Sequence, residues 1–348
     1  MAAMLRRTFL AGSCAALAHG AARAATERVK FGADLFSLRS QNWSPTEYLD
    51  YCAKRSVKVV HFSEIRFIGG LDDANLARVR KHAESLGIEV EIGMRSICPT
   101  SKMFDRSQGT AEEQLTRMIH SAGVAGSRIV RAVLGSAEDR TGSLPIEGHI
   151  ENTVKVLRNV RSRVVDAGLK VAIENHAGDM QGRELKILIE EAGKDFVGAC
   201  LDSGNPLWTI EDPHLTLETL APYVLTSHIR DTAVWDTPRG AAVAWTRMGD
   251  GNIDIAGYVR RYAELCPGRA LSLEIIVTGA RYYNYRDPKF WDGYRHTPAW
   301  EFARFLALAQ KGTPRPDPPK LSKEAAVVRE REDLDASILW TKDLLGRL

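Results

Sequence analysis

The feature that most constrains the fold is an alternation of strand-like and helix-like segments, repeated eight times between residues 28 and 311. The strand-like segments are short, rich in Val, Ile and Leu, and bounded by turn residues. They cover residues 29–36, 57–64, 88–95, 128–134, 170–176, 197–202, 224–230 and 270–276. Strands that alternate with helices form a parallel sheet covered by helices. Eight such units without a long interruption predict a closed (β/α)8 TIM barrel.

The segments between the strands carry the signals that begin and end helices. Ser44 and Glu47 have the spacing of a capping box at a helix start. The runs 71–86, 146–167 and 184–192 each end at a glycine, which is the usual residue of a left-handed helix C-cap. No G-x-G-x-x-G motif follows the first strand, so a dinucleotide-binding fold lacks its main signal.

The chain departs from this repeat after residue 311. Residues 312–320 form a Pro-rich linker, and residues 322–345 predict a charged helix with a sparse apolar face. We expect residues 312–348 to add this C-terminal helix to a barrel of residues 28–311. The helix packs on the barrel exterior or on a second subunit, so a homo-oligomer is one expectation and a solvated tail is the alternative.

The N-terminal segment has the pattern of a targeting signal. Arg6 and Arg7 precede Phe9 and Leu10, and an Ala-rich stretch follows and ends at a small-residue cleavage pattern in residues 22–24. The paired arginines resemble a twin-arginine export signal. We therefore expect residues 1–25 to be a signal peptide and the protein to be periplasmic. An ordinary signal peptide or a disordered N-terminus is the alternative.

The charge and composition exclude several classes of protein. The formal charge of +3 comes from three arginines of the N-terminal segment, so the rest of the chain is neutral and does not indicate a nucleic-acid partner. No run of 18 apolar residues occurs, so no membrane span is expected. The remaining cysteines show no disulfide spacing. With 44% apolar residues, the chain can bury a large core without such bridges.

The last four predicted strands each end in a residue that can bind a metal. These residues are Glu174, Asp202, His228 and Glu274. The carboxyl ends of barrel strands meet at one mouth, where active sites lie, so we expect the four side chains to face one another. Three carboxylates and one imidazole suit Mn²⁺, Mg²⁺ or Co²⁺ and, less specifically, Zn²⁺. The sequence therefore predicts one divalent metal, with Mn²⁺ as the first expectation.

The motifs around these residues resemble those of a known superfamily. The motifs are Glu174-Asn175-His176, residues 201–205, residues 228–231, residues 248–254 and Leu273-Glu274. They are similar to the signature of the xylose isomerase-like TIM barrels, a superfamily of sugar-phosphate isomerases and epimerases. The resemblance covers most of residues 28–311. It implies that the four residues bind one divalent metal and that Glu174 and Glu274 double as catalytic acid and base.

The residue types predict chemistry at a carbon next to a carbonyl. A divalent ion polarises the carbonyl, and a carboxylate removes the neighbouring proton to give an enediolate. A sugar isomerase or epimerase is the first expectation. The alternative is a lyase on an oxidised sugar: a dehydratase, a 3-keto-glycoside eliminase or a β-keto sugar acid decarboxylase. A non-catalytic sugar-binding barrel is the alternative from another class. A nuclease would need a histidine-rich metal cluster, which this chain does not offer.

The expected substrate is a small sugar or keto-sugar, and several side chains are candidates to bind it. His176 and Arg230 each follow a predicted metal ligand by two residues, so they share its inward face. A structural role for His176 and a salt bridge for Arg230 are the alternatives. The segment 282–294 holds six aromatic residues, which either stack on a sugar or pack as a structural loop or dimer contact. The candidate contacts are His61, Glu64, His176, Arg230, Arg281, Tyr283 and Trp291.

Overall fold

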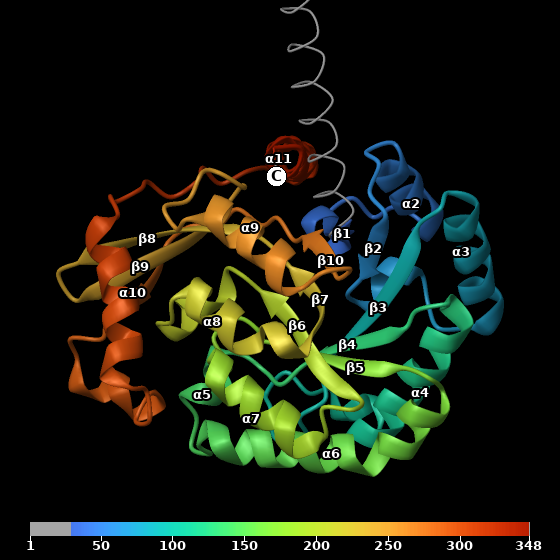
Figure 1. The fold of residues 1–348 in the computed structure, drawn as a ribbon, viewed down its shortest axis with the longest axis horizontal. Coiled ribbons are helices and arrows are strands. Elements are labelled where there is room, and N and C mark those ends of the chain that lie inside the picture. The colour runs from blue at the N-terminus through green and yellow to red at the C-terminus, as the bar shows by residue number, and fades with distance from the viewer. Residues whose placement is uncertain (1–28, 348) are drawn as a thin grey trace, which may run out of the picture.

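The predicted strands form one parallel barrel in the computed structural model, which describes residues 29–347 (Figure 1). In barrel order they are β1 (Lys30–Asp34), β2 (Val59–Phe62), β3 (Glu89–Ser96), β4 (Ile129–Val133), β5 (Lys170–Glu174), β6 (Val197–Asp202), β7 (Val224–His228) and β10 (Ala270–Leu273). The β10 strand pairs with β1. It also meets the end of β7, because the Ile229 amide donates to the Ser272 carbonyl at 2.7 Å. The TIM-barrel prediction is confirmed.

Helices cover the outside of the barrel (Figure 1). They are α2 (Pro45–Ala53), α3 (Asp73–Ser85), α4 (Ala111–Ala125), α5 (Ala137–Arg140), α6 (Ile146–Asp166), α7 (Gly182–Ala192), α8 (Pro213–Leu220) and α9 (Ile255–Leu265). The predicted capping box at the start of α2 is present, since the Ser44 amide donates to Glu47 Oε2 at 2.7 Å. Gly87 follows α3 with φ 64°, a left-handed conformation that glycine adopts without steric cost.

A small antiparallel sheet lies beside the barrel. Two of its strands interrupt the repeat between β7 and α9, and the third follows β10. The sheet consists of β8 (Asp231–Thr237), β9 (Gly240–Thr246) and β11 (Arg281–Tyr283). The sequence did not predict this sheet, because β9 is rich in alanine rather than β-branched residues. The helix α10 (Ala299–Lys311) packs against β8 and lies outside the barrel at the left of Figure 1.

The C-terminal helix α11 (Lys323–Leu345) lies between α9 and α2, where the ring of helices around the barrel would otherwise be open (Figure 1). Gln41 Nε2 donates to the Val327 carbonyl at 2.7 Å, and the Tyr51 hydroxyl donates to Asp335 Oδ1 at 2.7 Å. The helix expected as an addition therefore occupies the eighth place around the barrel. The helix α10, which precedes the Pro-rich linker, packs on the small sheet instead.

The sequence also led to expectations about a signal peptide, membrane spans and disulfides. The expected signal peptide, residues 1–25, lies outside the described residues, so export to the periplasm stays a prediction.

Among the helices of residues 29–347, none combines the length and apolar character that a membrane crossing needs. Cys52, Cys98, Cys200 and Cys266 are buried and unpaired in this part of the chain, as small apolar side chains commonly are.

We expect the apolar face of α11 to stabilise the barrel. Leu334 is 1% exposed, whereas Leu339 on the same helix is 70% exposed. Leu334→Ala should lower the free energy of unfolding by about 2–5 kcal/mol, because it opens a cavity in the core. Leu339→Ala is the matched control and should change it by less than about 0.5 kcal/mol. Urea unfolding followed by circular dichroism measures both, and equal effects would show that α11 does not pack as described.

Candidate metal centre and active site

The structure brings the four predicted metal ligands together at one end of the barrel. Glu174, Asp202 and His228 are the last residues of β5, β6 and β7, and Glu274 directly follows β10. One ligand atom of each residue lies within 4.8 Å of those of the other three. The Nδ1 atom of His228 is 3.0 Å from Glu174 Oε2 and 3.2 Å from Glu274 Oε2. All four side chains are more than nine-tenths buried.

The donor set fits a divalent cation. His228 Nδ1 is buried and has no hydrogen-bond partner among the described residues, although it faces two carboxylates. Asp202 Oδ1 accepts hydrogen bonds of 2.7 Å from the amides of Gly204 and Asn205, which fixes the orientation of this carboxylate. Three carboxylates in one buried cluster repel one another unless positive charge separates them. A divalent ion with oxygen and nitrogen ligands would supply that charge.

Two buried arginines already compensate part of the negative charge. Arg131 on β4 places its Nε 2.6 Å from Glu174 Oε2. Arg230 places its Nη2 2.5 Å from Asp202 Oδ2 and also contacts Glu274. Burial raises the pKa of Glu174, but Arg131 and His228 outweigh burial, so this pKa lies well below its usual value. Burial also raises the pKa of Glu274, but Arg230 and His228 outweigh burial and lower this pKa to about 2. Both glutamates are therefore ionised, as metal ligands must be.

His61 is buried beside the candidate metal ligand His228. Its Nδ1 is 2.9 Å from His228 Nε2, and its side chain is fully buried. On β2 it is in register with Asp34, the last residue of β1, and with Glu91 of β3. Burial lowers the pKa of His61 well below its usual value, so this imidazole is neutral. His61 therefore contacts one of the four candidate metal ligands, and its expected role in substrate binding stays a prediction.

A cavity of about 340 Å³ opens above the metal ligands. Its walls include the predicted residues Glu64, His176 and Arg230 together with Glu174 and Glu274. The Nδ1 of His176 donates to the Gly135 carbonyl at 2.7 Å, which leaves Nε2 as an acceptor. Glu64 pairs with Arg66 at 2.6 Å. The volume lies at the lower end of the range for small-molecule sites, which suits a single sugar ring or chain.

The aromatic segment 282–294 does not form the wall of this cavity. Tyr283 is 6% exposed and pairs with Ala241 across β11 and β9. Trp291 donates its indole N–H to the Tyr285 carbonyl at 2.8 Å. The Trp291 ring also packs edge-on against Phe302 of α10, with centroids 4.9 Å apart. Neither Tyr283 nor Trp291 lines this cavity, so their expected contact with a sugar stays a prediction.

Two other tryptophans line the cavity in their place. Trp208 and Trp245 stack face to face with ring centroids 4.0 Å apart and an interplanar angle of 9°. The guanidinium of Arg281 lies 4.5 Å from the Trp208 centroid, and that of Arg230 lies 4.3 Å from the Trp245 centroid. Because each ring already covers one face of the other, the two arginines occupy the outer faces. Arg281 therefore packs on the face of Trp208 that points away from Trp245.

Sequence reasoning missed several residues that the fold brings to the site. Arg131 carried a usable signal, because a charged residue inside the apolar strand Ile129–Val133 needs a buried partner of opposite charge. Trp245 carried no signal, since it belongs to the unpredicted sheet. Asp231, in the motif of residues 228–231, accepts hydrogen bonds from the amides of Gly249 and Gly251.

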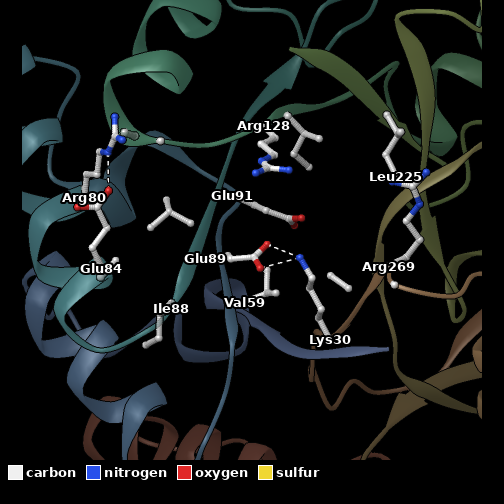
Figure 2. Close-up of a pocket in the computed structure, with 17 residues that line it drawn as sticks. Lys30, Val59, Arg80, Glu84, Ile88, Glu89, Glu91, Arg128, Leu225 and Arg269 are labelled. Atoms are coloured by element: carbon white, nitrogen blue, oxygen red, sulfur yellow. Dashed lines mark hydrogen bonds and ion pairs between the residues drawn. The ribbon is translucent and has the colours of Figure 1, made fainter. Parts of the chain in front are cut away.

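A second cavity lies at the opposite end of the barrel (Figure 2). Figure 2 shows two ion pairs in it: Lys30 with Glu89 at 2.6 Å and Arg80 with Glu84 at 2.8 Å. These residues lie at the amino ends of the strands or on the helix before β3. Barrel enzymes carry their active sites at the carboxyl ends, so the cavity above Glu174 and Glu274 is the candidate active site.

Comparison with known families gives one match that covers more than half of the chain. Residues 49–290 match the family model described as a xylose isomerase-like TIM barrel. The matched range contains the four candidate ligands and both tryptophans of the cavity wall.

Individual relatives are distant. The chain is 25% identical over 185 residues to 3-oxo-isoapionate decarboxylase of Pectobacterium atrosepticum, which covers 53% of this chain and 60% of that protein. It thus spans less than two thirds of this relative. Among solved structures, a D-psicose 3-epimerase has a TM-score of 0.59 at 16% identity, covering 91% of this chain and all of that one. The IolI protein with a bound zinc atom has a TM-score of 0.56 at 13% identity, covering 89% and 98%.

We expect the protein to bind about one equivalent of a divalent metal at the four clustered ligands. Glu174→Gln and His228→Ala each remove a ligand and should weaken binding by at least about 100-fold, more than the loss of an outer partner. Glu64→Gln is the control, because Glu64 lines the cavity outside the cluster. Elemental analysis after equilibrium dialysis against Mn²⁺ or Zn²⁺ measures the metal. Equal metal content in all four proteins would refute the site.

Proposed function

Because the chain belongs to the xylose isomerase-like TIM-barrel family, we propose that it is a divalent-metal-dependent sugar isomerase or epimerase. The observation that carries the proposal is the cluster of Glu174, Asp202, His228 and Glu274, whose ligand atoms lie within 4.8 Å of one another. It lies at the floor of a cavity that fits a small sugar. The reaction would begin with removal of a proton next to a carbonyl and pass through an enediolate.

A bound divalent ion, Mn²⁺ in preference to Mg²⁺, Co²⁺ or Zn²⁺, would polarise the substrate carbonyl and acidify the neighbouring C–H bond. Glu174 and Glu274 stand on the two outer strands of the four that carry the cluster, so they approach the substrate from two sides. Both are ionised and can accept a proton. In an isomerase, the carboxylate that removes the proton would hold it as a carboxylic acid and return it to the next carbon. In an epimerase, the other glutamate would first take a proton from solvent and then deliver it to the opposite face.

A lyase on an oxidised sugar is the second candidate. The similarity to a 3-oxo-isoapionate decarboxylase favours it, because loss of CO₂ from a β-keto acid passes through the same kind of enolate. Loss of a β-hydroxyl or of a glycosidic group would need only a different leaving group on the same intermediate. The fold does not choose among these reactions, so the products must be identified directly.

Proton exchange with solvent tests the proposal. We expect the metal-loaded protein to incorporate deuterium next to the carbonyl of a keto-sugar in D₂O, as measured by ¹H NMR. Glu174→Gln or Glu274→Gln should slow this exchange by at least about 100-fold, as loss of an acid–base group does. Glu211→Gln is the control, because Glu211 is a buried glutamate hydrogen-bonded to Gly182 and Thr216 and lies outside the cavity wall.

The products separate the candidates. A new ketose, aldose or epimer identifies the isomerase or epimerase, whereas CO₂ or an unsaturated sugar identifies the lyase. Sugar binding without deuterium exchange or product, in protein shown to hold metal, would contradict both and leave a non-catalytic sugar-binding barrel.

A further inference from the structure

Arg95 differs from the other arginines in the wall of the cavity. It lies near the end of β3, its side chain is exposed, and it lines the cavity together with Arg131, Arg230, Glu174 and Glu274. Arg131 is tied to Glu174, and Arg230 is tied to Asp202 and Glu274. Within residues 29–347, no hydrogen bond or ion pair engages the guanidinium of Arg95. The hydrogen bonds from Ser107 lower the pKa of Asp105 and the charge of Arg95 contributes to that shift, but the two side chains form no ion pair.

The acids around the cavity offer Arg95 no partner. Glu64 is paired with Arg66, and Glu174 and Glu274 are paired with Arg131 and Arg230. Arg95 therefore carries a positive charge that no described acid of the cavity wall or of the metal cluster compensates. A neutral sugar would leave this charge uncompensated, whereas a substrate with one carboxylate would neutralise it.

The position of Arg95 fixes which end of a substrate it could reach. The metal ligands stand on β5, β6, β7 and β10, whereas Arg95 stands on β3, separated from β5 by β4. A substrate whose carbonyl lies at the metal ligands would therefore present its other end to Arg95. Guanidinium groups bind carboxylates through two parallel hydrogen bonds, and an exposed, unpaired guanidinium is free to do so.

We infer that the substrate is a sugar acid whose non-reacting carboxylate is bound by Arg95. This inference rests on the proposed function, because it assigns the class of substrate for the same site. Arg95 is then a specificity residue that contacts the substrate but takes no part in proton transfer.

Two matched pairs of probes test the inference. D-Gluconate and D-sorbitol differ only in a carboxylate or hydroxymethyl end and report binding by calorimetry on the metal-loaded protein. D-Fructuronate and D-fructose differ in the same way and report deuterium exchange. We expect the wild type to prefer the acid of each pair by about 10- to 100-fold, the range of a charged hydrogen-bonded pair.

Variants of Arg95 should change this preference. Arg95→Gln should bring the acid and the neutral sugar to equal affinity, chiefly through a higher KM for the acid. Arg95→Lys should retain part of the preference, because it keeps the charge and loses the two-point geometry. Arg128→Gln is the matched control. Arg128 is also exposed and unpaired within the described residues, but it lines the cavity at the far end of the barrel (Figure 2).

The outcomes separate this inference from the proposed function. Arg95-dependent binding of gluconate without exchange of any ketose would support the carboxylate site and contradict the proposed chemistry. Deuterium exchange at equal kcat/KM for the two ketoses, unaffected by Arg95→Gln, would overturn the carboxylate site and leave the proposed chemistry standing. Equal affinity of the wild type for gluconate and sorbitol would also overturn it.

Discussion

The pairing of buried arginines with buried carboxylates is the interaction on which the site depends. Glu174, Asp202 and Glu274 converge in an interior that solvates charge poorly, and Arg131 and Arg230 supply the compensating charge. Gly204 makes room for Arg230, because a Cβ atom at this position would lie 2.5 Å from Arg230 Cγ. A Cβ atom at Gly93 would lie 2.9 Å from the Ser63 carbonyl oxygen and 3.2 Å from Arg131 Cδ.

The small sheet outside the barrel contributes directly to the candidate active site. Trp245, at the end of β9, stacks on Trp208 and covers Arg230, which in turn contacts two candidate metal ligands. The small sheet is an insertion in the barrel repeat, and through Trp245 and Arg230 it contacts the candidate metal ligands. Loops and insertions at the carboxyl ends of the strands are the parts of a barrel that vary between enzymes. In this chain such an insertion forms the stacked wall of the cavity, and the barrel strands supply the metal ligands.

The sequence allowed the four candidate ligands to be placed with their correct strands because the argument needed only strand ends. Every parallel strand of a barrel ends at the same mouth, so Glu174, Asp202, His228 and Glu274 meet whatever the details of packing. The sequence did not allow the burial of each side chain to be predicted in the same way. His61 was expected to contact a substrate, but it is fully buried and lies 2.9 Å from His228. Burial of this kind depends on contacts between distant segments, which no local pattern specifies.

The sequence by itself therefore determined the barrel, its alternating elements and the residue types that meet at its mouth, because strand and helix periodicity and turn residues act locally. Only the tertiary structure decided which helix covers the eighth face and which aromatic rings line the cavity. The helix α11 took that place rather than α10, and Trp208 and Trp245 lined the cavity rather than Tyr283 and Trp291. These choices depend on which apolar surfaces fit together across long sequence separations, and hydrophobicity alone does not specify the partner.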